Sequence, residues 1–399
     1  MFNGYFEGKR ILVTGVVGVK GTWLALALLE AGAEVLGLDL RLPHSDSNFV
    51  ASRLGDRISF TQGDVTDLPL MQQLVGQADG IFHLAALALV RDAYRNPLEA
   101  YRTNTLGPAA ILEALRLSLV PKRAVFITTD KVYKPKDGEL WAETDPLGAS
   151  GPYAVSKACA EFIIADYQRT YLSSGGSRIG VARAGNVLIG GDWHSSRKTQ
   201  GAGRIFVDCF ESLAENRAPE IYSPNFTRPY TYGLDILAGY MTLMSMLDSD
   251  GIAGEAFNFG PYEQHGVSNA LLATKICELW GGNLMWRSGH PREEPFEHQS
   301  LAFDKSRQRL HWRPAYTLYE ALRSTTQWYK EWTRQSGCSR ERCMFEFNRE
   351  LLREHRIAAN NLGIAWAAGD QARNPEGGEP VQPEPGVTAA GEAVKESAP

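Results

Sequence analysis

A tyrosine and a lysine lie four residues apart, at Tyr153 and Lys157. Residues with this spacing share one face of a helix. The lysine ammonium would stabilise a tyrosinate, lowering the tyrosine pKa toward the working range, and could also hold a cofactor ribose. Such a tyrosine can remove a proton from an alcohol while hydride leaves the carbon. The spacing alone is equally consistent with an ordinary amphipathic helix, so its meaning depends on the residues upstream.

Three polar residues, Thr129, Asp130 and Lys131, directly follow the apolar run 124–128. An aspartate that burial keeps protonated can act as a general acid, and a lysine beside it can act as a base. Alone, such a pair is typical of a solvated charge pair at the end of a strand. Because Thr129 and Tyr153 accompany it, we favour catalytic roles for both Asp130 and Lys131.

Three glycines, Gly15, Gly18 and Gly21, lie between an apolar run at 10–14 and a helical pattern at 21–31. Glycines allow the backbone to turn tightly and to approach a pyrophosphate without a Cβ clash. The following helix would direct free N–H groups and its positive dipole end at the phosphates. A simple glycine-rich turn is the alternative, but the strand before and the helix after favour a dinucleotide site.

An aspartate, Asp39, ends the second apolar run, where a carboxylate could accept hydrogen bonds from the adenosine ribose. This favours NAD over NADP, because a carboxylate repels the 2′-phosphate of NADP. Arg41 leaves the choice open, since an arginine can accept that phosphate. Asp64, after the third run, could contact the adenine, although a plain turn aspartate is nearly as consistent with its place.

Short apolar runs alternate with helical patterns through the first half of the chain. This order is typical of βαβ units and predicts an α/β fold, a Rossmann-type doubly wound parallel sheet. The predicted strands are 10–14, 34–38, 58–61, 80–84, 124–128 and 178–183, and a long amphipathic helix is predicted at 98–117.

After residue 185 the alternation fades, and helical patterns appear at 234–247, 268–280 and 318–331. We therefore expect four parts along the chain. They are an NAD-binding domain (1–185), a smaller C-terminal α/β substrate-binding lobe with some strands returning to the main sheet (186–335), a charged helical extension (336–365) and a disordered tail (366–399).

The composition excludes several classes of protein. The 399 residues include 41 Lys and Arg against 46 Asp and Glu, a net charge of −5 that gives no basic footprint for nucleic acid. The five cysteines and eight histidines show no CxxC or HExxH spacing, so we predict neither a disulfide framework nor a metal site. No apolar run approaches the roughly 20 residues that span a bilayer. We expect a cytoplasmic protein without a membrane partner.

Taken together, these motifs resemble those of the extended short-chain dehydrogenase/reductase family. The segments that carry the resemblance, in the family's order, are Thr14–Gly21, His83–Ala86, Thr129, and Tyr153 with Lys157. The resemblance implies NAD as the cofactor. The residues that it places around NAD are Gly15, Gly18, Gly21, Asp39, Arg41, Asp64, Val65, Leu84, Ala85, Ala86, Asn104, Tyr153 and Lys157.

Over residues 5–332 the chain is similar to sugar-nucleotide 4,6-dehydratases, in particular those that act on CDP-glucose. The more specific matching segments are Gly18–Leu24, Leu89–Arg91, Thr129–Lys131, Arg183–Val187, Gly190–Trp193, Arg228–Pro229 and Asn258–Pro261. The resemblance implies oxidation of an NDP-hexose at C4, loss of water across C5–C6 and hydride return to C6. The product would be a 4-keto-6-deoxy sugar nucleotide.

The same resemblance implies a role for each polar residue near the sugar. Tyr153 would take the proton of the 4-hydroxyl, Asp130 would release the 6-hydroxyl, and Lys131 would act as the base or support the enolate. The substrate would be bound by Arg91, Asn186, Arg204 and Arg228. Helices at 98–117 and 153–171 would pair two subunits in a homodimer.

Several positions depart from the pattern of these dehydratases. Leu87 and Ala88 replace a glutamine and a proline, and the stretch between Trp193 and Arg204 is longer than usual. In the glycine loop, valines 16, 17 and 19 replace His, Thr and Phe. These changes leave the base and sugar of the substrate open. The alternatives are a sugar-nucleotide 4-epimerase or reductase of the same family, and a non-catalytic NAD-binding protein. Asp130 and Lys131 argue against the epimerase, because an epimerase expels no hydroxyl.

Overall fold

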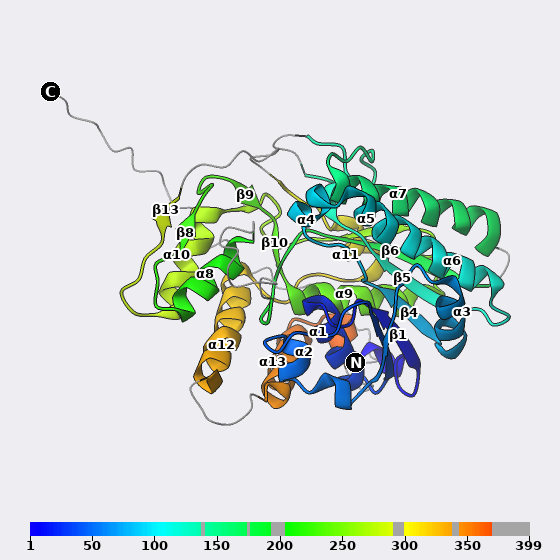
Figure 1. The fold of residues 1–399 in the computed structure, drawn as a ribbon, viewed down its shortest axis with the longest axis horizontal. Helices are drawn as coiled ribbons and strands as arrows, with labels where there is room; N and C mark the ends of the chain where they lie inside the picture. Colours follow the sequence, from blue (N-terminus) through cyan, green and yellow to red (C-terminus); the bar gives the residue numbers. More distant parts are fainter. Residues whose placement is uncertain (137–139, 174–175, 193–203, 290–298, 337–342, 369–399) are drawn as a thin grey trace.

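The computed structural model describes residues 1–136, 140–173, 176–192, 204–289, 299–336 and 343–368. Its centre is a seven-stranded sheet with the strand order β11-β6-β5-β4-β1-β2-β3, and every pairing in it is parallel (Figure 1). The strands are β1 (Arg10–Thr14), β2 (Glu34–Asp39), β3 (Ser59–Gln62), β4 (Gly80–His83), β5 (Arg123–Ile127), β6 (Arg178–Ala184) and β11 (Ala256–Phe259). Because the order extends in both directions from β1, the predicted doubly wound sheet is confirmed.

Alternate residues of the central strands supply two separate cores. Ile11 and Val13 of β1 are buried in the core on one face of the sheet, whereas Leu12 between them is buried in the core on the other. Both faces are therefore covered. This explains why the strands are continuous apolar runs rather than alternating polar and apolar residues.

The main helices divide between the two faces. α3 (Leu68–Gln77), α6 (Gly107–Leu117) and α7 (Pro152–Tyr167) pack together over one face. α1 (Val19–Glu30) and α9 (Gly233–Met246) pack together over the other, where α9 contacts β5 and β6. In Figure 1, α7 lies above the sheet and α9 below it. The carboxyl ends of the parallel strands are thus held between two rigid helical layers.

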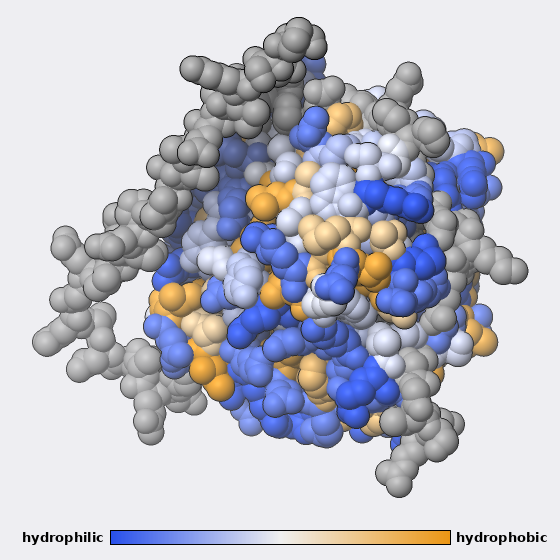
Figure 2. All heavy atoms as spheres, turned by 90° about the vertical axis from the view of Figure 1, so that its left-hand side faces the viewer, coloured by the Kyte–Doolittle hydropathy of each residue, from blue (hydrophilic) through white to orange (hydrophobic). Residues whose placement is uncertain are grey.

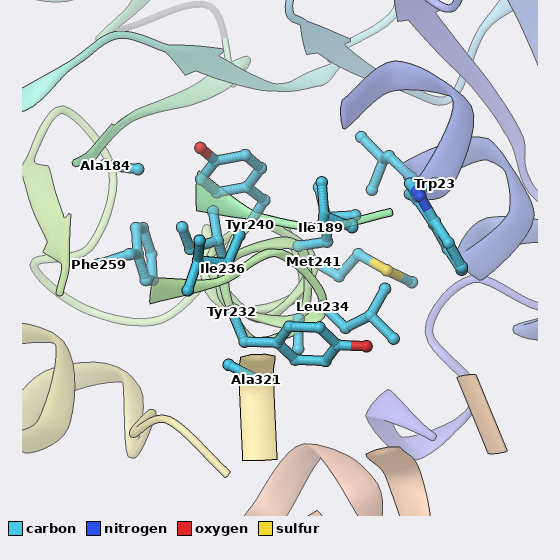
Figure 3. Packing of buried hydrophobic residues seen from close by; sticks show 14 of the residues in the cluster. Trp23, Ala184, Ile189, Tyr232, Leu234, Ile236, Tyr240, Met241, Phe259 and Ala321 are labelled. Carbon is cyan, nitrogen blue, oxygen red and sulfur yellow. The ribbon is translucent and has the colours of Figure 1, made fainter. Parts of the chain in front are cut away.

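Helix α9 is apolar on every side because it is enclosed on every side. Figure 3 shows Leu234, Tyr240 and Met241 projecting from it in different directions, with Trp23 of α1 and Ala321 of α12 (Leu318–Ser336) among the neighbours. All three α9 side chains are buried. The helix belongs to the middle of the molecule, although its sequence lies in the part expected to form the smaller lobe.

One acidic residue, Asp235, interrupts this apolar helix. Its carboxylate accepts backbone hydrogen bonds from Ala315 at 2.7 Å and Tyr316 at 3.2 Å, and lies 2.8 Å from Nε2 of His355. A buried carboxylate is tolerated when its oxygens are paired in this way. Asp235 therefore joins α9 to the chain before α12 and to the C-terminal helix α13 (Phe345–Asn361).

The predicted single helix at 98–117 is wrong in its first half. The chain forms α5 (Pro97–Tyr101), the π-helical segment η3 (Arg102–Leu106) and then α6. Pro108 gives a physical reason, since it has no N–H to donate to the carbonyl of Asn104 and its ring would clash with that carbonyl in a regular α-helix. The wider π turn avoids this conflict and is a common feature of functional sites.

Residues after 185 form short strand pairs and helices rather than a second large sheet. The pairs are β7 (Asn186–Leu188) with β10 (Tyr230–Tyr232), β8 (Glu220–Ile221) with β13 (Arg287–Ser288), and β9 (Thr227–Arg228) with β12 (Val267–Ser268). They are accompanied by α8 (Ile205–Ala214), α10 (Asn269–Trp280) and α12. Figure 2, seen from this side, shows small groups of apolar residues among polar ones. β11 from the same part of the chain pairs with β6 of the main sheet.

The C-terminal extension packs back onto the N-terminus. Trp366 of η6 (Ala365–Ala367) is buried and stacks on Phe2, with ring centroids 5.4 Å apart, and on His355 at 5.5 Å. The folded part therefore continues past 366, where the tail was predicted to begin, because the indole ring is buried there. Residues 369–399 lie outside the described residues.

Several short helices complete the described part of the chain. They are η1 (Phe2–Gly4), α2 (Asn48–Ala51), η2 (Leu54–Asp56), α4 (Val90–Arg95), η4 (Asp130–Val132), η5 (Gln168–Leu172) and α11 (Asp304–Leu310). Within the described ranges, every helix is too short or too polar to cross a membrane.

Candidate active site

The glycine loop between β1 and α1 is folded closely against the loop that follows β4. Gly15 has a φ of +74°, and a Cβ there would lie 2.7 Å from the backbone nitrogen of Ala85. A Cβ on Gly21 would collide with the carbonyl oxygen of Gly15. Gly18 immediately precedes α1, so the free N–H groups of that helix open toward the loop. This bare backbone fits a pyrophosphate group.

Asp39 lies at the end of β2 and organises the loop around it. Its carboxylate accepts backbone hydrogen bonds from Val17 at 3.0 Å and from Arg41 at 3.2 Å. Burial raises the pKa of Asp39, although these hydrogen bonds oppose the effect. Arg41 is exposed. The carboxylate thus joins the glycine loop to the strand end at which a dinucleotide ribose would lie.

Asp64 is paired with a cation of the same domain. It accepts hydrogen bonds from the backbone and hydroxyl of Thr66, at 2.9 and 2.8 Å, and contacts Arg102 at 2.5 Å. Burial opposes ionisation, but these contacts outweigh it, and the pKa of Asp64 lies below its usual value. The side chain of Val65 is buried in the core, so a cofactor contact there would have to use its backbone.

The segment His83–Ala86 is anchored to β1 through Thr14. The hydroxyl of Thr14 accepts the backbone N–H of Ala85 at 3.2 Å and lies 2.8 Å from Nδ1 of His83. Burial, with a smaller contribution from Lys157, lowers the pKa of His83 to about 3, so the ring is neutral. Leu84 and Ala86 are partly buried beside it. These hydrogen bonds hold the segment His83–Ala86 against the turn of the glycine loop.

The buried Asn104, in the π-helical segment η3, ties the next stretch of this loop to α7. Its Oδ1 accepts the backbone N–H of Leu87 at 2.8 Å, and its Nδ2 donates to the hydroxyl of Ser156 at 2.9 Å. The π turn therefore places an amide between two segments that carry predicted site residues. Leu87, one of the departures from the dehydratase pattern, is held through its backbone.

Thr129, Asp130 and Lys131 follow β5 in a single tight turn. The Thr129 hydroxyl donates to Oδ1 of Asp130 at 3.0 Å and accepts the backbone N–H of Lys131 at 3.3 Å. Asp130 is fully buried, and Nζ of Lys131 lies 3.7 Å from its Oδ1. Oδ2 of Asp130 has no hydrogen-bond partner within the described part of the chain. A buried carboxylate oxygen without a partner is costly, so this atom is suited to meet a ligand.

Tyr153 and Lys157 lie one turn apart on α7, and Thr129 lies close enough to Tyr153 to influence its pKa. Burial and the charge of Asp130 raise the pKa of Tyr153 to about 12, against the effect of Thr129. The sequence predicted that Lys157 would lower the pKa of Tyr153. In the protein without a cofactor this prediction is wrong, because the pKa is raised. Burial dominates, and Nζ of Lys157 donates to the carbonyl of Ile127 at 3.0 Å.

The pKa of Lys157 is lowered to about 7, mainly by burial and then by the charge of Lys20, while Glu161 opposes the shift. Burial also lowers the pKa of Lys20 itself, with Asp192 and Asp130 acting in the opposite direction. Lys20 therefore lies within electrostatic reach of the proposed catalytic residues. The sequence reasoning assigned it no role.

A local signal could have identified Lys20. It is in the first turn of α1, where the positive end of the helix dipole disfavours a cation. A residue that breaks such a local rule commonly marks a functional site. Lys20 would place a positive charge where the glycine loop meets Asp130 and Asp192.

Two of the predicted substrate residues meet beside Asp130. The backbone N–H of Asn186 donates to the carbonyl of Pro229, the neighbour of Arg228, at 3.2 Å. A Cβ on Gly185 would lie 3.1 Å from both Oδ2 of Asp130 and Pro229. The corner formed by β7 and the end of β9 therefore abuts the oxygen of Asp130 that lacks a partner in the described residues.

The predicted substrate arginines contact protein groups in this structure. Arg204 pairs with Asp192. Nη1 of the buried Arg228 donates to the carbonyl of Thr227 at 2.8 Å. Arg91, in α4, is half-buried, and α4 packs against α7. Most of the longer stretch after Asp192, including Trp193, lies outside the described residues.

Comparison with known proteins identifies the family. The model of the NAD dependent epimerase/dehydratase family matches residues 11–260. The chain belongs to this family. Its members depend on NAD, and NAD is the cofactor that the glycine loop, the α1 N-terminus and Asp39 are arranged to hold.

Dehydratases and epimerases of this family are both similar to the chain. CDP-glucose 4,6-dehydratase of Salmonella typhimurium is 32% identical over 345 residues, which cover 83% of this chain and 93% of the relative. A crystal structure of dTDP-glucose 4,6-dehydratase from Streptomyces venezuelae with NAD bound has a TM-score of 0.69 at 25% identity, covering 81% of this chain and 97% of that one. UDP-glucose 4-epimerase of Thermotoga maritima has the same fold, with a TM-score of 0.69, 23% identity, and coverage of 81% and 99%.

Other predicted features concern cysteines and metals. Cys159, Cys209, Cys277 and Cys343 are free thiols, and Cys338 lies outside the described residues. The described ranges contain no group of three or more His, Cys, Asp or Glu side chains placed to hold a metal ion.

Proposed function

We propose that this member of the epimerase/dehydratase family is a sugar-nucleotide 4,6-dehydratase with CDP-glucose as its first expected substrate. The observation that carries the proposal is that Thr129 lies between Tyr153 and Asp130: its hydroxyl donates to Asp130 and influences the pKa of Tyr153. An acceptor for an alcohol proton and a buried acid are thereby joined in one site. The 32% identity to a CDP-glucose 4,6-dehydratase supports the same reaction.

We assign each proton transfer of the dehydration to a residue of this site. Tyr153, oriented by Thr129, accepts the proton of the sugar 4-hydroxyl. NAD+, held by the glycine loop and Asp39, would supply a two-electron acceptor that takes the C4 hydride and returns it to C6 after the loss of water, and a positive charge that favours the phenolate of Tyr153. The 4-ketone acidifies the proton on C5, which Lys131 takes or whose enolate it stabilises. Asp130, through the oxygen that lacks a partner in the described part, protonates the 6-hydroxyl so that it departs as water.

The nucleotide diphosphate is expected beside the β7–β9 corner. Arg228 and Arg204 would share their guanidinium groups between the diphosphate and their present contacts, since a planar guanidinium has several donors. Asn186 would donate to the phosphate or the sugar, and Arg91 would reach the substrate from α4. Lys20 adds a cation on the side of the glycine loop.

We further propose the predicted homodimer, through the helices at 98–117 (α5, η3 and α6) and 153–171 (α7 and η5). The exposed apolar side chains Leu98, Leu106 and Phe162 gather on these elements, with exposed fractions of 83%, 53% and 62%. Such a face is a normal dimerisation surface. Replacement of Leu98 by Glu should lower the sedimentation coefficient to that of a monomer. The expected domain division and the cytoplasmic location stay predictions.

The test is incubation of the purified protein with CDP-glucose, with and without added NAD, followed by mass spectrometry. Dehydration gives a sugar nucleotide lighter by one water that reacts as a ketone. A product of unchanged mass but altered retention would instead identify a 4-epimerase. If CDP-, UDP-, dTDP- and GDP-glucose all remain unaltered, the proposal is wrong.

A further inference from the structure

The turn that carries Thr129, Asp130 and Lys131 must be fixed by its surroundings. It connects β5, which ends at Ile127, to Tyr133, and its only regular structure is the short η4. A displacement of about 1 Å in such a segment can cost two orders of magnitude in rate. The contacts that hold its two ends therefore bear directly on the reaction.

A buried ion pair lies behind this turn and joins α7 to β6. Nε of Arg183 lies 3.0 and 3.1 Å from the two carboxylate oxygens of Glu161, and Nη2 makes a further contact with Oε2. Neither side chain is more than 6% exposed. The pair is bidentate, which fixes the relative orientation of the two side chains.

Each partner of the ion pair holds one end of the turn. The hydroxyl of Thr128, immediately before the turn, donates to Oε1 of Glu161 at 2.6 Å. Nη1 of Arg183 donates to the hydroxyl of Tyr133, immediately after it, at 2.8 Å, and the guanidinium lies 4.8 Å from the centre of that ring. The Tyr133 hydroxyl in turn donates to Asn258 of β11 at 2.6 Å.

Glu161 also continues the catalytic face of α7. Tyr153, Lys157 and Glu161 follow one another at intervals of four residues, so they lie along one side of the helix. Among the charged groups around Lys157, Glu161 favours its charged form, whereas burial and Lys20 disfavour it. His83, the other titratable group affected by Lys157, is neutral.

Stability does not explain this arrangement. Removing two charges from water is expensive, and replacing a buried ion pair by apolar side chains of similar size is often neutral or stabilising. The two hydrogen bonds that link the pair to Thr128 and to Tyr133 instead reach the two ends of the turn that carries the proposed catalytic residues, and Glu161 lies on the same helix as Tyr153 and Lys157.

We propose that Glu161 and Arg183 are a positioning pair, which holds the turn of Thr129, Asp130 and Lys131 in register with Tyr153 and Lys157. The proposal rests on the proposed function for its kinetic consequences. Neither residue is expected to touch substrate or cofactor.

The decisive variant replaces both charges at once, as Glu161→Leu with Arg183→Met. Apolar side chains of similar size should preserve the melting temperature, while kcat falls about 100-fold with KM nearly unchanged. The alkaline limb of the pH–rate profile should move to lower pH, because the carboxylate that favours protonated Lys157 is gone. Wild-type kcat and an unmoved limb in this variant would show that the pair is only structural.

A matched control is the buried contact between His355 and Asp235, at 2.8 Å, which lies in the C-terminal packing. His355→Gln should lower the melting temperature without moving the pH–rate profile. If the double variant fails to fold, Thr128→Val cuts the link to Glu161 alone. It should lower kcat several-fold, and an unchanged kcat there would overturn the proposal.

A second measurement separates this proposal from the proposed function. Amide hydrogen exchange of residues 128–133 should accelerate in the double variant but not in His355→Gln. Faster exchange in a protein that dehydrates no sugar nucleotide would retain the positioning pair and reject the dehydratase. Unchanged exchange in an active enzyme would do the reverse.

Discussion

The proposed proton-transfer side of the site and the proposed phosphate side are built differently. Thr129 and Tyr153 lie on a central strand end and on a helix of 16 residues, and a buried network supports them from behind. Asn186 and Arg228 lie on strands of three and two residues, and Arg204 lies just before α8 beside a stretch outside the described residues. The first side is fixed by the sheet and the second by local pairings.

This difference predicts different kinetic roles. Groups that are rigidly held and lack spare partners are suited to act on the transition state, so their loss should lower kcat. Arg204 already has a partner in Asp192. A group of this kind is expected to bind the substrate and the transition state about equally, so its loss should weaken substrate binding without changing kcat. Variants on the first side should therefore change kcat, and variants on the second side should change KM.

The largest effect is expected for Tyr153→Phe. Loss of the phenolic hydroxyl removes the acceptor of the 4-hydroxyl proton, and kcat should fall about 1,000-fold. NAD should still bind, because the glycine loop and Asp39 are untouched, and its retention can be measured by releasing the cofactor and quantifying it by chromatography. Turnover equal to that of the wild type would remove Tyr153 from the mechanism.

Asp130→Asn should lower turnover by about 100-fold and act on a later step. An amide keeps the shape of the side chain but cannot give a proton to the 6-hydroxyl. Single-turnover absorbance at 340 nm should show C4 oxidation at close to the wild-type rate, followed by slow loss of the signal. If oxidation itself is slowed and elimination is not, the assignment of Asp130 as the acid is wrong.

Arg228→Gln tests the phosphate side. Losing one guanidinium contact to a diphosphate should raise KM roughly 10-fold or more while kcat stays within a few-fold of the wild type. Arg287→Gln is the matched control, because Arg287 pairs with Glu220 on the surface with 68% of its side chain exposed. A variant of Arg228 that lowers kcat without changing KM would break the proposed division between the two sides.

The same division separates what the sequence could reveal from what it could not. The residues of the first side lie in contiguous motifs, Thr129–Lys131 and Tyr153–Lys157, on strands and helices whose periodicity is visible. The pairing of Asn186 with Tyr230, and of Thr227 with Ser268, joins residues about 40 positions apart in strands too short to show any period. The contacts of Thr128 with Glu161 and of Tyr133 with Arg183 join residues that are 33 and 50 positions apart, and are equally invisible in the sequence.

Two further misses have local causes. The π turn at Arg102–Leu106 was hidden because Pro108 was counted as an ordinary position in a helical pattern. The raised pKa of Tyr153 could not be predicted, because the spacing of Tyr153 and Lys157 does not show that Tyr153 is buried and lies near the charge of Asp130. Burial depends on how the whole chain packs, so the spacing of Tyr153 and Lys157 could not reveal it.

The smallest expected effect, and the one that sharpens the comparison most, is that of Lys20→Met. In the proposed mechanism Lys157 acts in its protonated form, so the rate should fall as pH rises through the pKa of Lys157, which lies at about 7. Lys20 lowers that pKa, and removing its charge should move the alkaline limb of the profile upward by about one pH unit or less. Lys275→Met, in a surface pair with Glu278, should leave the limb in place.

A limb that moves upward for Lys20→Met and downward for the Glu161 and Arg183 double variant would place Lys157 between two opposing charges. A limb unmoved by Lys20→Met would assign that lysine to the phosphate side, where its loss should raise KM instead.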